Sequence, residues 1–268
     1  MNKSLLFLFV VIFSFLFPII LYIWWKKKNE CGWAAFVVGV ICFLLFANTI
    51  ESFVHYYFLM TNKTTAAFFN STPIAYAIYG AVMAGLFEET GRLVGFKFFL
   101  SNHKEKETSV GYGIGHGGVE CFLVLGMTYL TYFVVANGGT LGDAALDASA
   151  LQSIELINIG IIPVAIAERI SAMMIHIGLS IMVFRAVNEK GSIKYFPIAI
   201  ALHIISDIPA GMYQAGLINS VVIVEVFTIA ISICILFYAI KMYQDMEFDY
   251  EDYGDLENEV SIDEDDEE

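Results

Sequence analysis

Long apolar runs recur along almost the whole chain, and they constrain its fold more than any other feature. Each run is long enough to cross a bilayer, which takes about 20 helical residues. Of the 268 residues, 58% are hydrophobic and only 16% are charged. In soluble domains about a quarter of the residues are charged. The sequence therefore predicts an all-α fold, a polytopic membrane helical bundle.

The apolar runs predict about seven transmembrane helices joined by short segments of polar and turn-forming residues. Their expected ranges are 4–25, 32–59, 72–100, 110–136, 154–187, 194–213 and 217–243. The segment around 137–152 has apolar residues at near-helical spacing and is expected to lie on the outer surface. We assign residues 1–244 to the bundle.

Lysine and arginine predict the orientation, because short cytoplasmic loops collect basic residues. With seven spans, the two residues Lys3 and Lys63 fall on one side of the membrane. The other side receives Lys26, Lys27, Lys28, Lys97, Lys104, Lys106, Arg185, Lys190, Lys194 and Lys241. This distribution predicts an outside N-terminus and a cytoplasmic C-terminus.

The net charge of −14 comes from the C-terminal segment. Residues 245–268 contain 14 of the 28 acidic residues and no lysine or arginine, so the remaining 14 acids balance 14 bases. A segment this acidic, without an apolar period, is predicted to be a disordered cytoplasmic tail. The rest of the chain has no large basic patch, which argues against nucleic acid as a partner.

Several ionisable residues fall inside the predicted spans, where they are costly and point to function. They lie on four helices between residues 72 and 213: Glu88, Glu89 and Arg92 on the third, His116 and Glu120 on the fourth, His176 on the fifth, and His203 and Asp207 on the sixth. At a helical rise of about 1.5 Å per residue, five of these acids and histidines lie about 9–18 Å from the cytoplasmic helix ends. They are Glu88, His116, Glu120, His176 and His203. We therefore expect one polar layer in the cytoplasmic half of the bilayer.

The spacing within each helix suggests how these groups cooperate. His116 and Glu120, like His203 and Asp207, are four residues apart and share a helix face. A carboxylate one turn from a histidine can chelate an ion with it or orient its imidazole. Glycines around His116 are expected to let helices approach and to leave room for a substrate or water.

Other ionisable residues are interpreted as structural. Glu168 and Arg169 lie nearer the outer face and are expected to form an ion pair. Glu51 with His55, and Glu225, lie toward the outer helix ends and are interpreted as interfacial or pairing groups.

The motifs resemble those of the CAAX-protease and bacteriocin-processing superfamily of intramembrane metalloproteases. Glu88-Glu89-x-x-Arg92 resembles its EExxR motif, and Tyr112-x-x-x-His116 is similar to its FxxxH motif. His203-x-x-x-Asp207 is similar to its HxxxN-type motif, with Asp in place of Asn. The segments ending at Glu120 and around His176 resemble the related PrsW-like proteases, and the combination is most similar to the YhfC-like branch.

This resemblance implies an endopeptidase embedded in a prokaryotic plasma membrane, acting on a membrane protein or on a lipidated or peptide substrate. It implies that His116, His176 and His203 bind a metal, with zinc (Zn²⁺) as the expected ion, and that Glu120 or Asp207 completes or buttresses the ligand set. Glu88 or Glu89 would be the general base, and Arg92 would hold the other glutamate ionised or stabilise the oxyanion. A metal-free variant, in which a glutamate and histidines activate water directly, stays open.

Two other functions stay open. The same carboxylates and histidines could form the ion path of a cation or proton transporter, although no internal repeat or broken helix supports that reading. The chain could also be a non-catalytic family member that binds a peptide.

Overall fold

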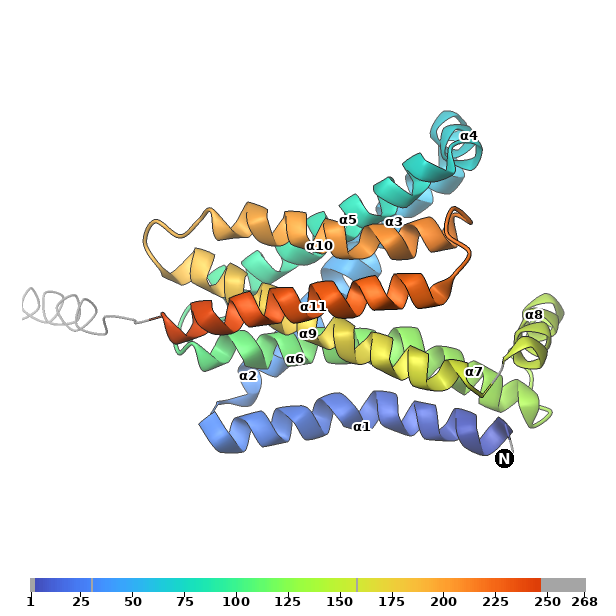
Figure 1. Cartoon of the computed structure of the whole chain (residues 1–268), viewed down its shortest axis with the longest axis horizontal. Coiled ribbons are helices and arrows are strands. Elements are labelled where there is room, and N and C mark those ends of the chain that lie inside the picture. The colour runs from blue at the N-terminus through green and yellow to red at the C-terminus, as the bar shows by residue number, and fades with distance from the viewer. Residues whose placement is uncertain (1–2, 30, 158, 247–268) are drawn as a thin grey trace, which may run out of the picture.

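The structure, a computed structural model, describes residues 3–29, 31–157 and 159–246. Within these ranges all regular secondary structure is helical, which confirms the predicted all-α fold (Figure 1). Except for its first two residues, the predicted acidic tail at 245–268 lies outside the described residues. The elements, with η marking wider π-helical turns, are α1 (Lys3–Asn29), α2 (Trp33–Cys42), η1 (Phe43–Glu51), α3 (Ser52–Tyr56), η2 (Tyr57–Thr61), α4 (Lys63–Ser71), α5 (Pro73–Val94), η3 (Gly95–Phe99), α6 (Glu107–Cys121), η4 (Phe122–Gly126), α7 (Met127–Ala136), α8 (Ala144–Leu156), α9 (Ile161–Asn188), α10 (Tyr195–Gln214) and α11 (Val221–Gln244).

Among the residues that the structure describes, six helical stretches are long and apolar enough to cross a membrane. They are Lys3–Asn29, Trp33–Thr61, Glu107–Ala136, Ile161–Asn188, Tyr195–Gln214 and Val221–Gln244. The remaining predicted span, 72–100, forms α5 and η3, which carry Glu88, Glu89, Arg92 and Lys97. Because α5 packs along α10 inside the bundle, its charges lie among helices rather than in open lipid.

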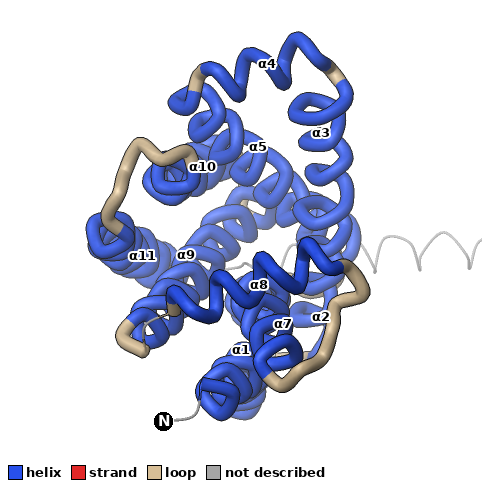
Figure 2. Tube along the Cα trace, turned by 90° about the vertical axis from the view of Figure 1, so that its right-hand side faces the viewer, coloured by secondary structure: helices blue, strands red, loops and turns tan. Residues whose placement is uncertain are grey.

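The prediction for the fifth span was wrong at its start. Residues 154–156 belong to α8, and α9 begins only at Ile161, because Ile157 adopts an extended backbone that ends α8. The Asp143 side chain caps α8 by accepting from the backbone N–H groups of Ala145 and Leu146. Helix α8 crosses one end of the bundle (Figure 2), where a helix lying on the surface was expected.

A second short helix at this end, α4, was not predicted. Its first turn is capped by Asn62, whose side chain accepts from the backbone N–H groups of Thr64 and Thr65. Helix α4 bridges the ends of α3 and α5 (Figure 2). The opposite end of the bundle holds the α9–α10 connection and the end of α11 (Figure 1).

Helix α9 is the centre of the bundle. It packs against α5, α6, α10 and α11. Of an 18-residue apolar stretch in this helix, 67% is buried, against 17–28% for the corresponding stretches of the other five candidate spans. Helix α6 lies between α9 and α2, and α1 packs against α6 and α7. The bundle therefore surrounds α9 and places α6 beside it.

Glycines on α6 allow this close packing on two sides. A Cβ atom at Gly115 would lie 2.1 Å from the Phe36 carbonyl oxygen on α2, and one at Gly113 would lie 2.7 Å from Ile177 Cα on α9. Glycine lets helix backbones come this close in lipid. The expected close approach is confirmed, but the room expected around His116 is filled at these positions by neighbouring helices.

Candidate metal centre

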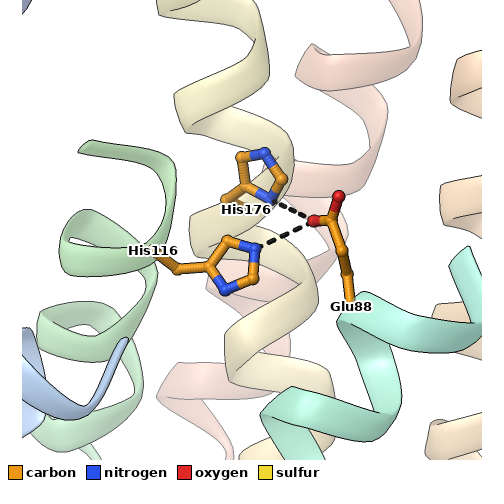
Figure 3. Close-up of side chains that lie close together, drawn as sticks. All are labelled: Glu88, His116 and His176. Carbon is orange, nitrogen blue, oxygen red and sulfur yellow. Dashed lines mark hydrogen bonds and ion pairs between the residues drawn. The ribbon is translucent and has the colours of Figure 1, made fainter. Parts of the chain in front are cut away.

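Four helices bring the predicted polar residues into one buried layer. Helix α5 contributes Glu88, Glu89 and Arg92, α6 contributes His116, α9 contributes His176, and α10 contributes His203, and all six residues are at most 8% exposed. The side chains of Glu88, His116 and His176 converge from three of these helices (Figure 3). The shared depth counted from helical rise therefore corresponds to real proximity.

The Glu88 carboxylate lies among three imidazoles. Its Oε2 atom is 2.9 Å from His116 Nε2, 3.9 Å from His176 Nδ1 and 3.8 Å from His203 Nε2. Glu88, His116 and His176 each offer one ligand atom, and these atoms all lie within 4.8 Å of one another. Donors this close together can share one cation.

Carboxylates also occupy the far sides of two of these rings. His176 Nε2 bonds to Glu120, and His203 Nδ1 bonds to Glu89 Oε1 at 2.7 Å. Because an ionised carboxylate only accepts, we assign the ring protons to those two nitrogens. This leaves His176 Nδ1 without a proton, so it accepts from Arg92 Nη2 at 3.1 Å and lies 3.9 Å from Glu88 Oε2. Such carboxylate–histidine pairs typically orient the ligands of protein metal sites.

The fully buried Arg92 contacts both Glu89 and His176. Its Nη1 atom donates to Glu89 Oε1 at 2.7 Å, and its Nη2 atom lies 3.1 Å from His176 Nδ1. The partner of Arg92 is therefore Glu89, three residues away, while Glu88 is left to the histidines. A buried arginine paired in this way neutralises one of the two adjacent glutamates.

Glu120 was expected to complete or buttress the ligand set, and it lies behind His176 rather than inside the cluster. Its second oxygen accepts from Arg169 Nη1 at 2.9 Å, and Arg169 also pairs with Glu168. The expected Glu168–Arg169 pair is thus present, but the contact of Arg169 with Glu120 was missed. Arg169 is seven residues before His176, about 10 Å along α9 by helical rise, yet both side chains reach Glu120.

Asp207 is the most open member of the predicted set, with 38% of its side chain exposed, and its Oδ2 atom is 3.4 Å from His203 Nε2. Away from this layer, His55 Nε2 pairs with Glu51 Oε1 at 3.0 Å, as expected for a separate pair nearer the helix ends. Asp207 is therefore the side of the cluster that faces accessible space.

The donor set fits a metal such as zinc, which proteins hold through imidazole nitrogens and carboxylate oxygens, with three protein ligands in catalytic sites. Within the described chain, His116 Nδ1 and Glu89 Oε2 are buried without a hydrogen-bond partner. Buried polar atoms without partners are rare and are often satisfied by an ion or water. The ligand types therefore fit a bound ion, whereas these two unpaired atoms lie outside the ligand group, in which His116 faces Glu88 through its Nε2 atom.

Comparison with known proteins agrees with this geometry. Residues 13–228 match the family described as YhfC intramembrane metalloprotease. The chain is 32% identical over 238 residues to a protein of Bacillus subtilis (strain 168) named "Uncharacterized membrane protein YhfC", with 85% of this chain and 92% of the relative covered. No solved structure matches. The chain is an integral membrane protein, and it belongs to the YhfC intramembrane metalloprotease family.

Proposed function

We propose that this protein is an intramembrane metalloendopeptidase, which hydrolyses a peptide bond in a membrane-associated protein or peptide. The observation that carries the proposal is the convergence of Glu88, His116 and His176 from three helices in a buried layer, with His203 beside them. Ionisable groups at this depth are costly and are usually kept for function. The family to which the chain belongs supports the same reaction class.

In this proposal Glu88, His116 and His176 hold a divalent metal, with zinc as the favoured ion. A bound metal of this kind supplies an acidified water molecule as the nucleophile. Glu120 and Glu89 orient the rings of His176 and His203 through the hydrogen bonds described above. Glu120 is thereby assigned to orienting a ligand.

His203 is proposed to move the proton. Its Nε2 atom faces both Glu88 Oε2 and Asp207 Oδ2, at 3.8 and 3.4 Å, while Glu89 fixes its Nδ1 atom. A histidine held on one nitrogen and open on the other can take a proton and return it to the leaving amine. Glu89, bonded to Arg92 as well, is better placed to support His203 than to take a proton itself.

The test is cleavage of a synthetic membrane-spanning peptide, labelled with a fluorophore and a quencher, by purified protein in lipid vesicles. We expect cleavage to stop in a strong chelator and to return with zinc. His116→Ala should lose both cleavage and metal. His203→Gln should lower the cleavage rate by about 10²–10⁴-fold yet retain the metal.

His55→Ala is the matched control, because it removes a histidine paired outside the layer. It should retain the metal. His103→Ala, which removes a histidine between η3 and α6 and away from the layer, should retain both cleavage and metal. Full cleavage by His116→Ala, or cleavage that persists in the chelator, would contradict the proposed function.

A further inference from the structure

A cleft of about 300 Å³ lies between α5, α10 and the α3–η2 stretch. Helix α5 lines it with Tyr76, Ala77, Tyr79, Gly80, Ala81 and Ala84, and α10 lines it with Asp207, Ala210, Gly211 and Gln214. His55 and Leu59 form its third side. None of these residues except Asp207 has a part in the chemistry proposed above.

The cleft leads to the buried layer. On α5, Ala77, Ala81 and Ala84 share a face with Glu88, which lies one turn beyond Ala84. On α10, Asp207 lines the cleft and is one turn from His203, with its Oδ2 atom 3.4 Å from His203 Nε2. The same two helix faces that form the walls of the cleft therefore carry the proposed reacting groups at its inner end.

The hollow is a feature of these walls rather than of loose helix packing. Helices α5 and α10 are in close contact at two levels. A Cβ atom at Gly85 on α5 would lie 2.7 Å from Ile204 Cγ1 on α10, and one at Gly211 on α10 would lie 2.9 Å from the Ala77 carbonyl oxygen on α5. At Gly80, in contrast, an added Cβ atom would meet nothing within 4 Å. The helices are in close contact on both sides of the opening, which is kept clear at Gly80.

The dimensions and chemistry of the cleft suit an extended peptide. From Tyr76 to Glu88 the helix rises about 18 Å, which an extended chain covers in about five residues. A peptide strand in a membrane needs hydrogen-bond partners for its backbone, and Tyr76, Gln214 and Asp207 offer polar atoms along the cleft. An acyl chain is a poor occupant, because the Asp207 carboxylate faces the space.

We propose that this cleft binds the substrate as an unwound strand, with about five residues on one side of the scissile bond and with small side chains against Gly80, Ala81 and Ala84. The inference rests on the proposed peptidase function and names its substrate class: membrane segments that contain a run of small residues able to leave the helical form. The strand enters from the bundle end at which α4 lies.

The experiment measures binding separately from cleavage. The probe is a biotinylated membrane-spanning peptide with Leu-rich ends, a central Gly-Ala-Ser-Ala-Gly run and a benzophenone beside that run. It is crosslinked to the His203→Gln protein, which should bind without turnover, and the crosslinks are mapped by mass spectrometry. We expect them on residues 76–84 and 207–214.

Gly80→Leu fills the cleft from a position with free space, and it should lower crosslinking at least about fivefold, a loss of about 1 kcal/mol in binding. Ile78→Phe, a similar enlargement at a side chain that is 45% exposed on the same helix, should leave crosslinking unchanged. A peptide with leucines in place of the small run should crosslink correspondingly less. Thermal unfolding of both variants checks that they are folded.

Crosslinking that Gly80→Leu does not reduce, or that maps to other helices, would overturn the inference. So would labelling of the cleft by a photoactivatable phospholipid that the peptide does not displace. If the cleft binds the peptide but the wild-type protein never cleaves it, the proposed function fails and the cleft stands. If cleavage occurs and Gly80→Leu does not slow it, the cleft fails and the peptidase stands.

Discussion

Gly113→Ala should disturb the candidate metal centre without touching any of its side chains. An alanine Cβ at Gly113 would lie 2.7 Å from Ile177 Cα and 3.0 Å from the His176 carbonyl oxygen, both backbone atoms of α9. Ordinary contacts begin at 3.4 Å, so α6 and α9 must separate by about 0.7 Å here, the difference between these two distances. The turn that moves carries His176, so its distance from His116 should increase.

Gly80→Ala is the matched comparison, because its Cβ atom meets nothing within 4 Å. Both variants gain the helix propensity of alanine over glycine, about 1 kcal/mol, so this gain cancels between them. What remains is the cost of overpacking α6 against α9, typically about 1–3 kcal/mol. Gly113→Ala should therefore be less stable than Gly80→Ala by that amount.

The assay is reversible denaturant unfolding of both variants in one detergent, with zinc affinity measured on the folded proteins. We expect weaker zinc binding only for Gly113→Ala. Equal free energies of unfolding together with equal zinc affinity would refute the view that glycine at Gly113 sets the spacing of α6 and α9.

Three further predictions concern other parts of the chain. Arg92→Met should lower the free energy of unfolding by about 3–5 kcal/mol, because it leaves Glu89 buried without its cation. Adding Glu89→Gln to Arg92→Met should recover part of this loss. An Arg92→Met protein as stable as wild type would contradict the Arg92–Glu89 pairing. Arg185 holds the pKa of Glu189 below its usual value of 4.5. The stabilisation by this partly exposed pair, below about 1 kcal/mol, should be present at neutral pH and disappear as the pH falls through that lowered pKa. The difference in free energy of unfolding between wild type and Glu189→Gln, measured from pH 7 downwards, tests this, and a difference that does not decrease would argue against it. Burial raises the pKa of the Cys31 thiol, so iodoacetamide should modify it slowly at neutral pH and faster above pH 9 in peptide mapping, whereas fast modification at pH 7 would be inconsistent with this burial.

Most of the fold was predictable from the sequence, because a bilayer requires long apolar helices wherever the chain crosses it. The span that began at 154 was placed wrongly, since the segment between α8 and α9 contains Ile157, Ile159 and Gly160 and no charged residue, so the apolar run continues across it. Helix α4 was missed because its composition, with Lys63, two threonines and Asn70, is that of a polar joint.

The candidate layer was predictable for a different reason. Helical rise fixes depth, so residues on antiparallel helices could be compared before any contact was known. Helical rise does not determine which neighbouring side chains pair. Arg92 reaches Glu89 rather than Glu88, and Arg169 on α9 reaches Glu120 on α6. The pattern also did not show whether the glycines of α6 enclose a cavity or a helix contact, because both require small residues.

The central claim is that Glu88, His116 and His176 hold a metal ion, and elemental analysis of detergent-purified protein tests it most directly. After growth with zinc, we expect about one metal ion per wild-type chain and per His55→Ala chain, and little or none in Glu88→Gln, His116→Ala and His176→Ala. A folded wild-type protein without metal, or His116→Ala with a full complement of it, would contradict the account.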